Sequence, residues 1–297
     1  MSKTTDIWQV GIVHRSVAEI MAAGLEGAPV TWLPEPGHFR FNADPFGLWY
    51  AGRFTVLVEA YDYRGKRGEI HYYTYDPDWR LADSGIALRR PFHLSYPALV
   101  RDGDAIHMLP EAHRSGNLTL YRAVRFPDRW QAAAVFDLPA IDASVVCHGG
   151  LWWMFHALPG PDGRAMRELH VAWSERLTGP WQPHAGNPVR RDVRSSRPGG
   201  TPFVWQGALH LPVQDCEAGY GAALNILRID ELTPQTFTAT VVKRVAPGFE
   251  PRYPDGLHTL SAAGDVTLID VKRLDRSSRV WVDLQRRWRR LVGGGGD

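Results

Sequence analysis

Acidic side chains recur at similar points along this chain, and a pair of carboxyl groups can do acid–base chemistry when one accepts a proton and the other donates it. Asp44, in the stretch FNADPF, comes directly before a proline and an aromatic-rich run. Asp142 precedes the apolar run ASVV, and Glu111 ends the run AIHMLPE. The simpler interpretation is that they are turn residues, since Asp and Pro start turns for backbone reasons alone. Which interpretation holds depends on the elements that position them.

The stretches around these acids belong to an internal repeat. Units begin near residues 44, 96, 142, 201 and 257. Each unit has a polar residue, a short apolar strand, a glycine turn and a second strand, and most units add a third strand. Antiparallel units of about 50 residues predict an all-β fold, a five-bladed β-propeller. A β-sandwich is the alternative, but it does not require a common period.

The two ends of the chain extend this prediction. The stretch IWQVGIV, residues 7–13, precedes the first unit, and the last unit is short of an outer strand. The N-terminal strand would complete the last blade and close the ring, which removes exposed sheet edges. We therefore expect a single propeller over residues 1–278, with one short helix within residues 15–24.

Residues 279–297 form a basic amphipathic tail, which we expect to be a short helix or strand. Trp281, Leu284, Trp288 and Leu291 make one apolar stripe with arginines opposite. A stripe of this kind packs against the protein or lies on a membrane surface. Packing is favoured, because each large apolar side chain left in water costs roughly 1.5–3 kcal/mol.

The composition and the termini of the chain limit the kinds of molecule that this protein is expected to bind. With 34 Lys and Arg against 32 Asp and Glu, the chain gives no electrostatic case for binding nucleic acid. The N-terminus has no apolar signal core and no stretch is long enough to span a membrane, so we expect a cytoplasmic protein. Cys147 and Cys216 are interpreted as buried thiols. No metal or cofactor motif is present, so neither is expected; a metal shared by His156 and His258 is the alternative.

In a propeller every inner strand begins on the same face, around one axis, so polar residues from all the units converge there. The predicted catalytic residues are Asp44, Glu111 and Asp142, and the predicted substrate-binding residues are Glu59, Tyr96, His156, Arg197, Asp215 and His258. For Glu59 and Asp270 the alternative is a hydrogen bond to backbone amides of the neighbouring blade. For His156 it is a buried imidazole bonded to a carbonyl.

The stretches NADPF and IDASVV…GGLWWMF resemble the five-bladed propeller glycosidases of families 43 and 32, and the related families 62, 68 and 117. The resemblance implies that Asp44 is the base or nucleophile and that Asp142 tunes the pKa of the acid. The general-acid glutamate of family 43 is missing, because the start of the fourth unit reads SSRPGGTPF with Arg197. Arginine does not donate a proton at neutral pH. We predict Glu111 as the substitute, with Asp215 second.

Longer phrases, SYPALV, MLPEA, LYRAVRFPDRW and GLHTLS, resemble the N-terminal domain of plant glucosamine inositolphosphorylceramide transferases and its bacterial stand-alone relatives. They lie between residues 95 and 261. This resemblance implies a role in glycoconjugate metabolism. Arg197 would suit a carboxylate or phosphate on the ligand, since its guanidinium binds such groups through two parallel hydrogen bonds.

These features together predict a carbohydrate-active enzyme that cleaves or transfers at a glycosidic bond of a small-molecule or glycan ligand, with an acidic or phosphorylated sugar as one option. A non-hydrolytic biosynthetic enzyme on the same scaffold, a transferase, lyase or cyclase, is the first alternative, and the missing acid and Arg197 favour it. A glycan-binding module is the second. Fold alone does not choose among them.

Overall fold

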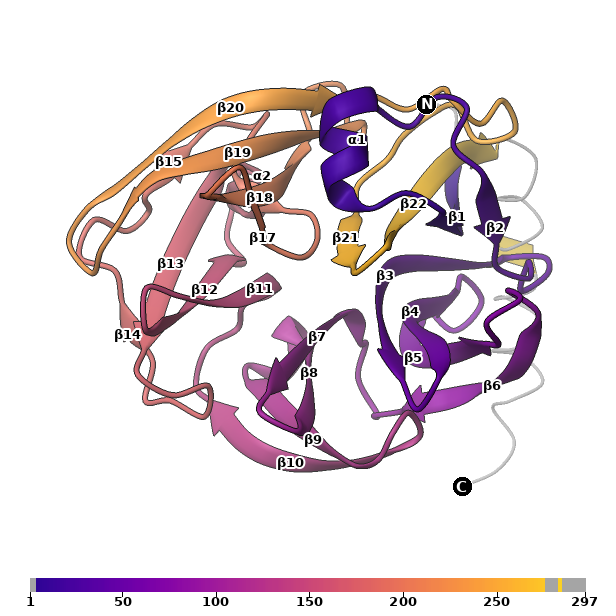
Figure 1. Cartoon of the computed structure of the whole chain (residues 1–297), viewed down its shortest axis with the longest axis horizontal. Coiled ribbons are helices and arrows are strands. Elements are labelled where there is room, and N and C mark those ends of the chain that lie inside the picture. The colour runs from indigo at the N-terminus through magenta and orange to yellow at the C-terminus, as the bar shows by residue number, and fades with distance from the viewer. Residues whose placement is uncertain (1–3, 276–282, 285–297) are drawn as a thin grey trace.

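The strands form five antiparallel sheets around one centre in the computed structural model, which describes residues 4–275 and 283–284 (Figure 1). This is the predicted five-bladed β-propeller. The first four blades follow chain order. Blade 1 holds β3 (Arg40–Tyr50), β4 (Arg53–Asp62), β5 (Arg67–Tyr75) and β6 (Leu81–Leu88). Blade 2 holds β7 (Ser95–Asp102), β8 (Ala105–Glu111), β9 (Leu118–Arg125) and β10 (Arg129–Phe136), with the short 3-10 helix His113–Ser115 after β8.

Blades 3 and 4 each contain additional short strands. Blade 3 holds β11 (Ile141–His148), β12 (Leu151–Ala157) and β13 (Glu168–Ser174), and the short helix α2 (Arg164–Arg167) precedes β13. Two short strands, β14 (Gln182–Pro183) and β15 (Arg190–Arg191), both pair with β13. Blade 4 holds β16 (Arg197–Pro198) and β17 (Phe203–Trp205), which both pair with β18 (Ala208–Asp215), and then β19 (Ala223–Leu232) and β20 (Phe237–Val245).

Blade 5 joins the two ends of the chain. Its inner strands are β21 (Leu260–Ala263) and β22 (Val266–Asp275), and its outer strands are β1 (Thr5–Val13) and β2 (Val30–Trp32). β1 pairs with β22 over its whole length, from Thr5 opposite Asp275 to Val13 opposite Thr267. The predicted closure by the N-terminal strand is confirmed, and it gives the edge of β22 a hydrogen-bonding partner.

The predicted helix is α1 (Val17–Ala23). Ser16 and Glu19 form a capping box at its start, and Ile20 and Met21 are buried. Of the tail, only Asp283 and Leu284 lie within the described residues, so its stripe and the boundary at residue 278 stay predictions.

Apolar contacts between neighbouring blades make the ring rigid. Where blade 5 meets blade 1, the side chains of Val10, Ile12, Phe54, Val56 and Leu268 pack together and are 0% exposed. Burying such a side chain contributes roughly 1.5–3 kcal/mol, so these contacts hold the blades at fixed angles around the axis.

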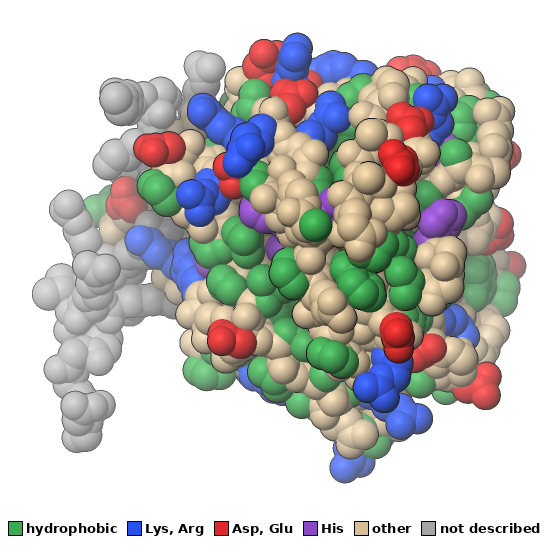
Figure 2. All heavy atoms as spheres, turned by 90° about the vertical axis from the view of Figure 1, so that its left-hand side faces the viewer, with side chains coloured by type: hydrophobic (Ala, Val, Ile, Leu, Met, Phe, Trp, Pro, Cys, Tyr) green, Lys and Arg blue, Asp and Glu red, His purple; other side chains and the backbone are tan. Residues whose placement is uncertain are grey.

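The outer side of the ring is mixed in character. Figure 2 shows the side that lies on the left in Figure 1, where hydrophobic side chains alternate with charged ones. Cys216 is buried, as predicted. Cys147, the last residue but one of β11, is exposed, so the prediction of a buried thiol is wrong for this residue. None of the described helices is long and apolar enough to cross a membrane.

Three inner strands share one irregularity at the axis. The pairing of β3, β7 and β11 shifts register just after Ala43, Ser95 and Ile141. The next residues, Asp44, Tyr96 and Asp142, have φ angles of 51°, 44° and 50°. A bulge of this kind re-aims a side chain, and a non-glycine residue there costs about 1–3 kcal/mol. The fold therefore stores strain in order to orient these three residues.

Candidate active site

The bulges and the strand ends bring seven charged or titratable side chains together, which we call the axial cluster: Asp44, Glu59, Glu111, Asp142, Arg197, His258 and Asp270. All but Arg197 are buried, with 0–7% of the residue exposed. The Arg197 side chain is 14% exposed. Six of the residues predicted from the sequence are in this cluster, while their catalytic or binding roles stay predictions.

Asp44 connects blades 1, 2 and 5. Its Oδ2 accepts a hydrogen bond from the Tyr96 amide at 3.2 Å, and its Oδ1 accepts one from the Thr259 hydroxyl at 3.3 Å. Burial raises the pKa of Asp44 to about 6, with His258 acting in the opposite direction. At neutral pH this carboxyl is therefore mostly ionised, yet close enough to neutrality to exchange a proton.

His258 is held in one orientation beside Asp44. Its Nδ1 lies 2.7 Å from Oδ1 of Asp270, which leaves Nε2 facing Oδ1 of Asp44 at 3.4 Å. Trp8 of β1 stacks on the imidazole at 3.8 Å. Oδ2 of Asp270 also accepts a hydrogen bond from the Asp44 amide at 2.9 Å. The backbone-binding role considered for Asp270 is thus present, together with a second role in orienting His258.

Asp142 and Arg197 form a buried ion pair. Nε of Arg197 donates to Oδ2 of Asp142 at 2.6 Å, and the Gln214 amide donates to the same oxygen at 3.0 Å. Burial raises the pKa of Asp142, while Arg197 acts to lower it. The guanidinium of Arg197 also lies over the Tyr220 ring, 5.1 Å from its centroid. One edge of Arg197 is therefore occupied by the protein itself.

The contacts of Glu111 oppose its predicted role as the proton donor. Its Oε1 lies 2.6 Å from Nδ1 of His113, and its Oε2 accepts a hydrogen bond from the Asp142 amide at 3.3 Å. Burial acts to raise its pKa, but the bonds from His113 and Asp142 and the charge of Arg197 prevail and lower the pKa to about 2. Glu111 is therefore ionised at neutral pH and acts as an acceptor that caps the neighbouring blade.

Glu59 has the opposite environment. Burial, followed by the charges of Asp44, Glu111, Asp142 and Asp270, raises the pKa of Glu59 well above its ordinary range. A raised pKa favours the protonated form of this carboxyl, which suits it to donating a proton.

His93, which the sequence analysis missed, contacts Glu59. Its Nδ1 accepts a hydrogen bond from the Gly68 amide at 2.8 Å, and its Nε2 lies 3.5 Å from Oε1 of Glu59. Burial lowers the pKa of His93 to about 4, so the ring is neutral with its proton on Nε2. Nε2 is thus the His93 atom nearest to the Glu59 carboxyl, at 3.5 Å from Oε1. The residue lies in a connection between blades, where the strand repeat gives no signal.

Tyr96 is closed to a ligand, contrary to its predicted role in substrate binding. It is 0% exposed, and its hydroxyl lies 2.7 Å from Oγ of Ser144 and 3.2 Å from the Gly200 carbonyl. The Gly200 amide also donates to this hydroxyl. Tyr96 therefore ties blades 2, 3 and 4 together beneath the carboxylates.

Two further predicted residues lie outside the axial cluster. His156 lines a cavity of about 850 Å³ with His170 and Trp181, and burial lowers its pKa to about 3. Its Nδ1 lies 3.4 Å from the Met154 carbonyl, as the alternative for a buried imidazole predicts.

Asp215 pairs with Arg244 at 3.3 Å, whereas its neighbour Gln214 reaches Asp142. Neighbouring residues of a strand point to opposite faces, so an error of one residue selects the wrong side chain.

One group of described residues has the types and spacing that suit a metal ion: Asp44, His258 and Asp270. Their potential ligand atoms lie within 4.8 Å of one another. Nδ1 of His258 and Oδ1 of Asp270 are already bonded to each other. A metal would have to replace that bond, so the arrangement fits a hydrogen-bonded chain better. The alternative of a metal shared by His156 and His258 does not fit, because His156 lines the separate cavity of about 850 Å³.

Solved structures share this fold at low sequence identity. A family 117 glycoside hydrolase from Zobellia galactanivorans aligns over 91% of both chains, with a TM-score of 0.57 and 11% identity. An exo-β-1,3-galactanase from Clostridium thermocellum aligns over 67% of this chain and 49% of its own, with a TM-score of 0.54 and 14% identity. These likenesses support the five-bladed propeller fold.

Sequence relatives are plant proteins. The chain is 38% identical over 205 residues to glucosamine inositolphosphorylceramide transferase 1 of Oryza sativa subsp. indica, and 34% identical over 215 residues to that of Arabidopsis thaliana. These matches cover 67% and 71% of this chain, but only 27% of each relative. The family model described as glucosamine inositolphosphorylceramide transferase 1, N-terminal, matches residues 34–250. The chain therefore belongs to the family of that N-terminal domain.

Proposed function

We propose that the axial cluster is the active site of a carbohydrate-active enzyme that acts at a glycosidic bond by acid–base chemistry. The observation that carries the proposal is the contrast between two buried carboxyls in one cluster. The pKa of Asp44 is about 6, and that of Glu59 lies well above its ordinary range. Pairs of carboxyl groups whose environments separate their pKa values are typical of enzymes that use one as base and one as acid.

Asp44 is the proposed base. Its carboxylate would take the proton of a water molecule or a sugar hydroxyl as that oxygen attacks the anomeric carbon. The Asp270–His258 pair supports the ionised form, because Asp270 fixes the imidazole so that Nε2 faces Asp44. This assignment agrees with the role that the resemblance to propeller glycosidases implies for Asp44.

Glu59 is the proposed acid, in place of Glu111. It would give its carboxyl proton to the oxygen that leaves the anomeric carbon, and the bond from that carbon to the leaving oxygen would break. His93 is the proposed positioning residue, because its Nε2 lies 3.5 Å from Oε1 of the Glu59 carboxyl. Asp142, held by Arg197 and Gln214, would set the electrostatic field around both groups.

Transfer to a sugar or lipid hydroxyl, rather than to water, is the second candidate. The plant relatives are named as transferases, which supports an acceptor hydroxyl in the position of the attacking water. Because the chain spans only 27% of those proteins, their activity is a proposal for this chain. The same two carboxyls would serve either reaction, since both need a base on the acceptor and an acid on the leaving group.

Replacing Asp44 by Asn and Glu59 by Gln tests the proposal against a panel of nitrophenyl glycosides and nucleotide sugars. Each variant should lose at least about 100-fold in turnover, as expected when general acid–base catalysis is removed. Asp215→Asn is the matched control, because this buried carboxylate pairs with Arg244 outside the axial cluster and should leave turnover within a few-fold of the parent. Equal losses in all three variants would contradict the assignment.

A further inference from the structure

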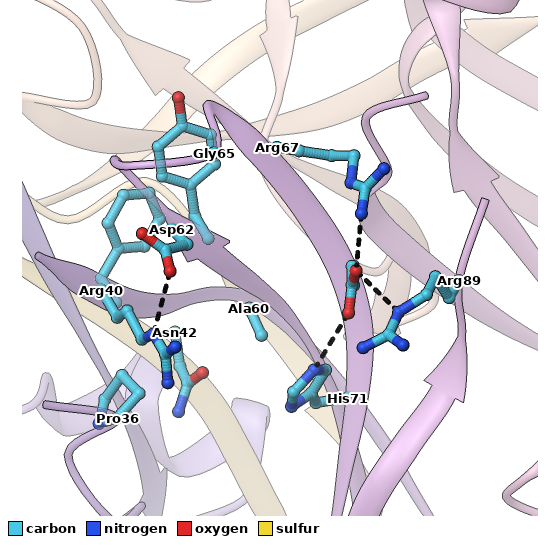
Figure 3. A pocket seen from close by; sticks show the side chains of 12 residues that line it. Pro36, Arg40, Asn42, Ala60, Asp62, Gly65, Arg67, His71 and Arg89 are labelled. Carbon is cyan, nitrogen blue, oxygen red and sulfur yellow. Dashed lines mark hydrogen bonds and ion pairs between the residues drawn. The ribbon is translucent and has the colours of Figure 1, made fainter. Parts of the chain in front are cut away.

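A second cavity lies at the end of blade 1 that is nearest the axial cluster. It has a volume of about 340 Å³ and is lined by the start of β3, the end of β4 and the start of β5 (Figure 3). Its walls include Asn42 and Ala60. Asn42 and Ala60 lie on the same strands as Asp44 and Glu59, so the cavity borders the part of blade 1 that carries these two axial carboxyls.

Three arginines line this cavity: Arg40, Arg67 and Arg89. Two carboxylates hold them. Oε1 of Glu69 lies 2.8 Å from Nε of Arg89 and 3.2 Å from Nη2 of Arg67 (Figure 3). Oδ2 of Asp62 lies 3.1 Å from Nε of Arg40. Burial acts to raise the pKa of Glu69, but the arginines lower it below its ordinary value, so this carboxylate keeps its charge. The three arginine side chains are 42–57% exposed, so these ion pairs orient the guanidinium groups and leave them accessible to a ligand.

Positive charge is in excess around the cavity. Asp62 also binds Arg64 at 2.6 Å, so two carboxylates serve four arginines. His71 adds no charge at neutral pH, because burial lowers its pKa. Within the residues that the structure describes, Arg40 and Arg67 each use one nitrogen in a side-chain ion pair and Arg89 uses its Nε. Among the residues that the structure describes, none accepts a hydrogen bond from the other side-chain N–H groups of these three arginines.

Free guanidinium donors of this kind suit one chemical class of ligand. Planar N–H groups in a fixed orientation bind the oxygens of phosphate or carboxylate groups with high specificity. Phe41 and Tyr61, whose rings stack at 5.1 Å, add an apolar wall against which a sugar ring can pack. Arg197 offers less, because its Nε is used by Asp142 and its side chain is largely buried.

We propose that the blade 1 cavity, with Arg40, Arg67 and Arg89, is an oxyanion-binding site that holds the phosphate or carboxylate group of a sugar ligand. The extension of that ligand to the axial carboxyls rests on the proposed function, whereas binding of the oxyanion does not. This assignment places the anionic part of the substrate at blade 1 rather than at Arg197.

Calorimetric titration at low ionic strength with inorganic phosphate, glucose 6-phosphate, glucuronate and glucose tests the proposal. The three anions should bind and glucose should not. The double variant Arg67→Gln/Arg89→Gln should bind each anion at least about tenfold more weakly, because charge-assisted hydrogen bonds are lost. Arg80→Gln is the matched control, since Arg80 is an exposed arginine of the same blade that pairs with Asp78 outside the cavity. Melting curves without ligand show that each variant is folded.

Failure of this site can be separated from failure of the active site. Asp44→Asn should keep phosphate binding while it loses turnover, because Asp44 lies outside the arginine set. The proposal is overturned if none of the anions binds, if glucose binds as tightly as glucose 6-phosphate, or if the double variant matches Arg80→Gln. It is also overturned if Arg197→Lys loses the anion while the double variant retains it. Tighter binding of glucose 6-phosphate than of inorganic phosphate would support a sugar-borne group as the source.

Discussion

Glu59 and Glu111 show how strongly the environment of a single residue decides its chemistry. Both are buried glutamates near the axial ends of second strands, in β4 and β8. Glu111 accepts hydrogen bonds and has a low pKa, whereas Glu59 faces other carboxylates and has a high one. The sequence places both near the axis, but it does not show which of them meets a donor. We therefore propose Glu59, rather than Glu111, as the acid.

Glu59→Gln should change the pH dependence of stability. Because the folded state raises the pKa of Glu59, its neutral form stabilises the fold at low pH, and this contribution is lost as pH rises through the folded pKa. The glutamine variant should therefore melt higher than the parent at pH 8, by at least about 2 °C if about 1 kcal/mol is regained. At pH 5 the two should melt alike. Calorimetry at both pH values is the measurement, and parallel curves for parent and variant would show that Glu59 is ionised.

Asp44→Asn should separate activity from stability. An amide keeps the shape and the acceptor oxygen for the Tyr96 amide, but it is no base, so turnover should fall with little change in melting temperature. In the parent, kcat/KM should rise with pH through about 6, where Asp44 ionises, and fall again where Glu59 loses its proton. A variant that is unfolded at room temperature would show that Asp44 is instead a structural turn residue.

At the scale of the elements, the order of the strands in most blades was predictable, because the strand–turn–strand pattern repeats along the sequence. The units, the glycine turns and the closing strand β1 were all predicted and are confirmed. The bulges were not, since register shifts at Asp44, Tyr96 and Asp142 have no clear signature. The bulges decide which side chains reach the axis, and the choice of Asp215 in place of its neighbour Gln214 has the same kind of origin.

Gly200 tests how tightly the blades meet below the site. Its φ is 135°, and an added Cβ would collide with the backbone of Leu260 in blade 5. Gly200→Ala should therefore destabilise the fold by at least about 3 kcal/mol, as backbone clashes in a packed region do. Gly207→Ala is the control, with a φ of 78° but nothing within 4 Å of its Cβ. Chemical denaturation compares the two, and equal losses would mean that φ strain alone accounts for the effect.

For the whole molecule, the tail provides a test that is independent of the chemistry. The predicted stripe of Trp281, Leu284, Trp288 and Leu291 falls largely outside the described residues. If it packs against the propeller, deleting residues 279–297 should lower the melting temperature and increase binding of a hydrophobic dye. If the shortened chain is as stable as the parent but no longer sediments with anionic liposomes, the tail is a membrane-surface segment.

This propeller is proposed to make or break a glycosidic bond with its axial carboxyls. The most direct measurement is proton NMR of the products from the panel of glycosides and nucleotide sugars, with the parent protein and Asp44→Asn side by side. With the parent, at least one anionic sugar substrate should give a new anomeric signal, and this signal should be absent with Asp44→Asn. Equal product from both proteins, or no change in any anomeric signal across the panel, would contradict the claim and favour a glycan-binding module.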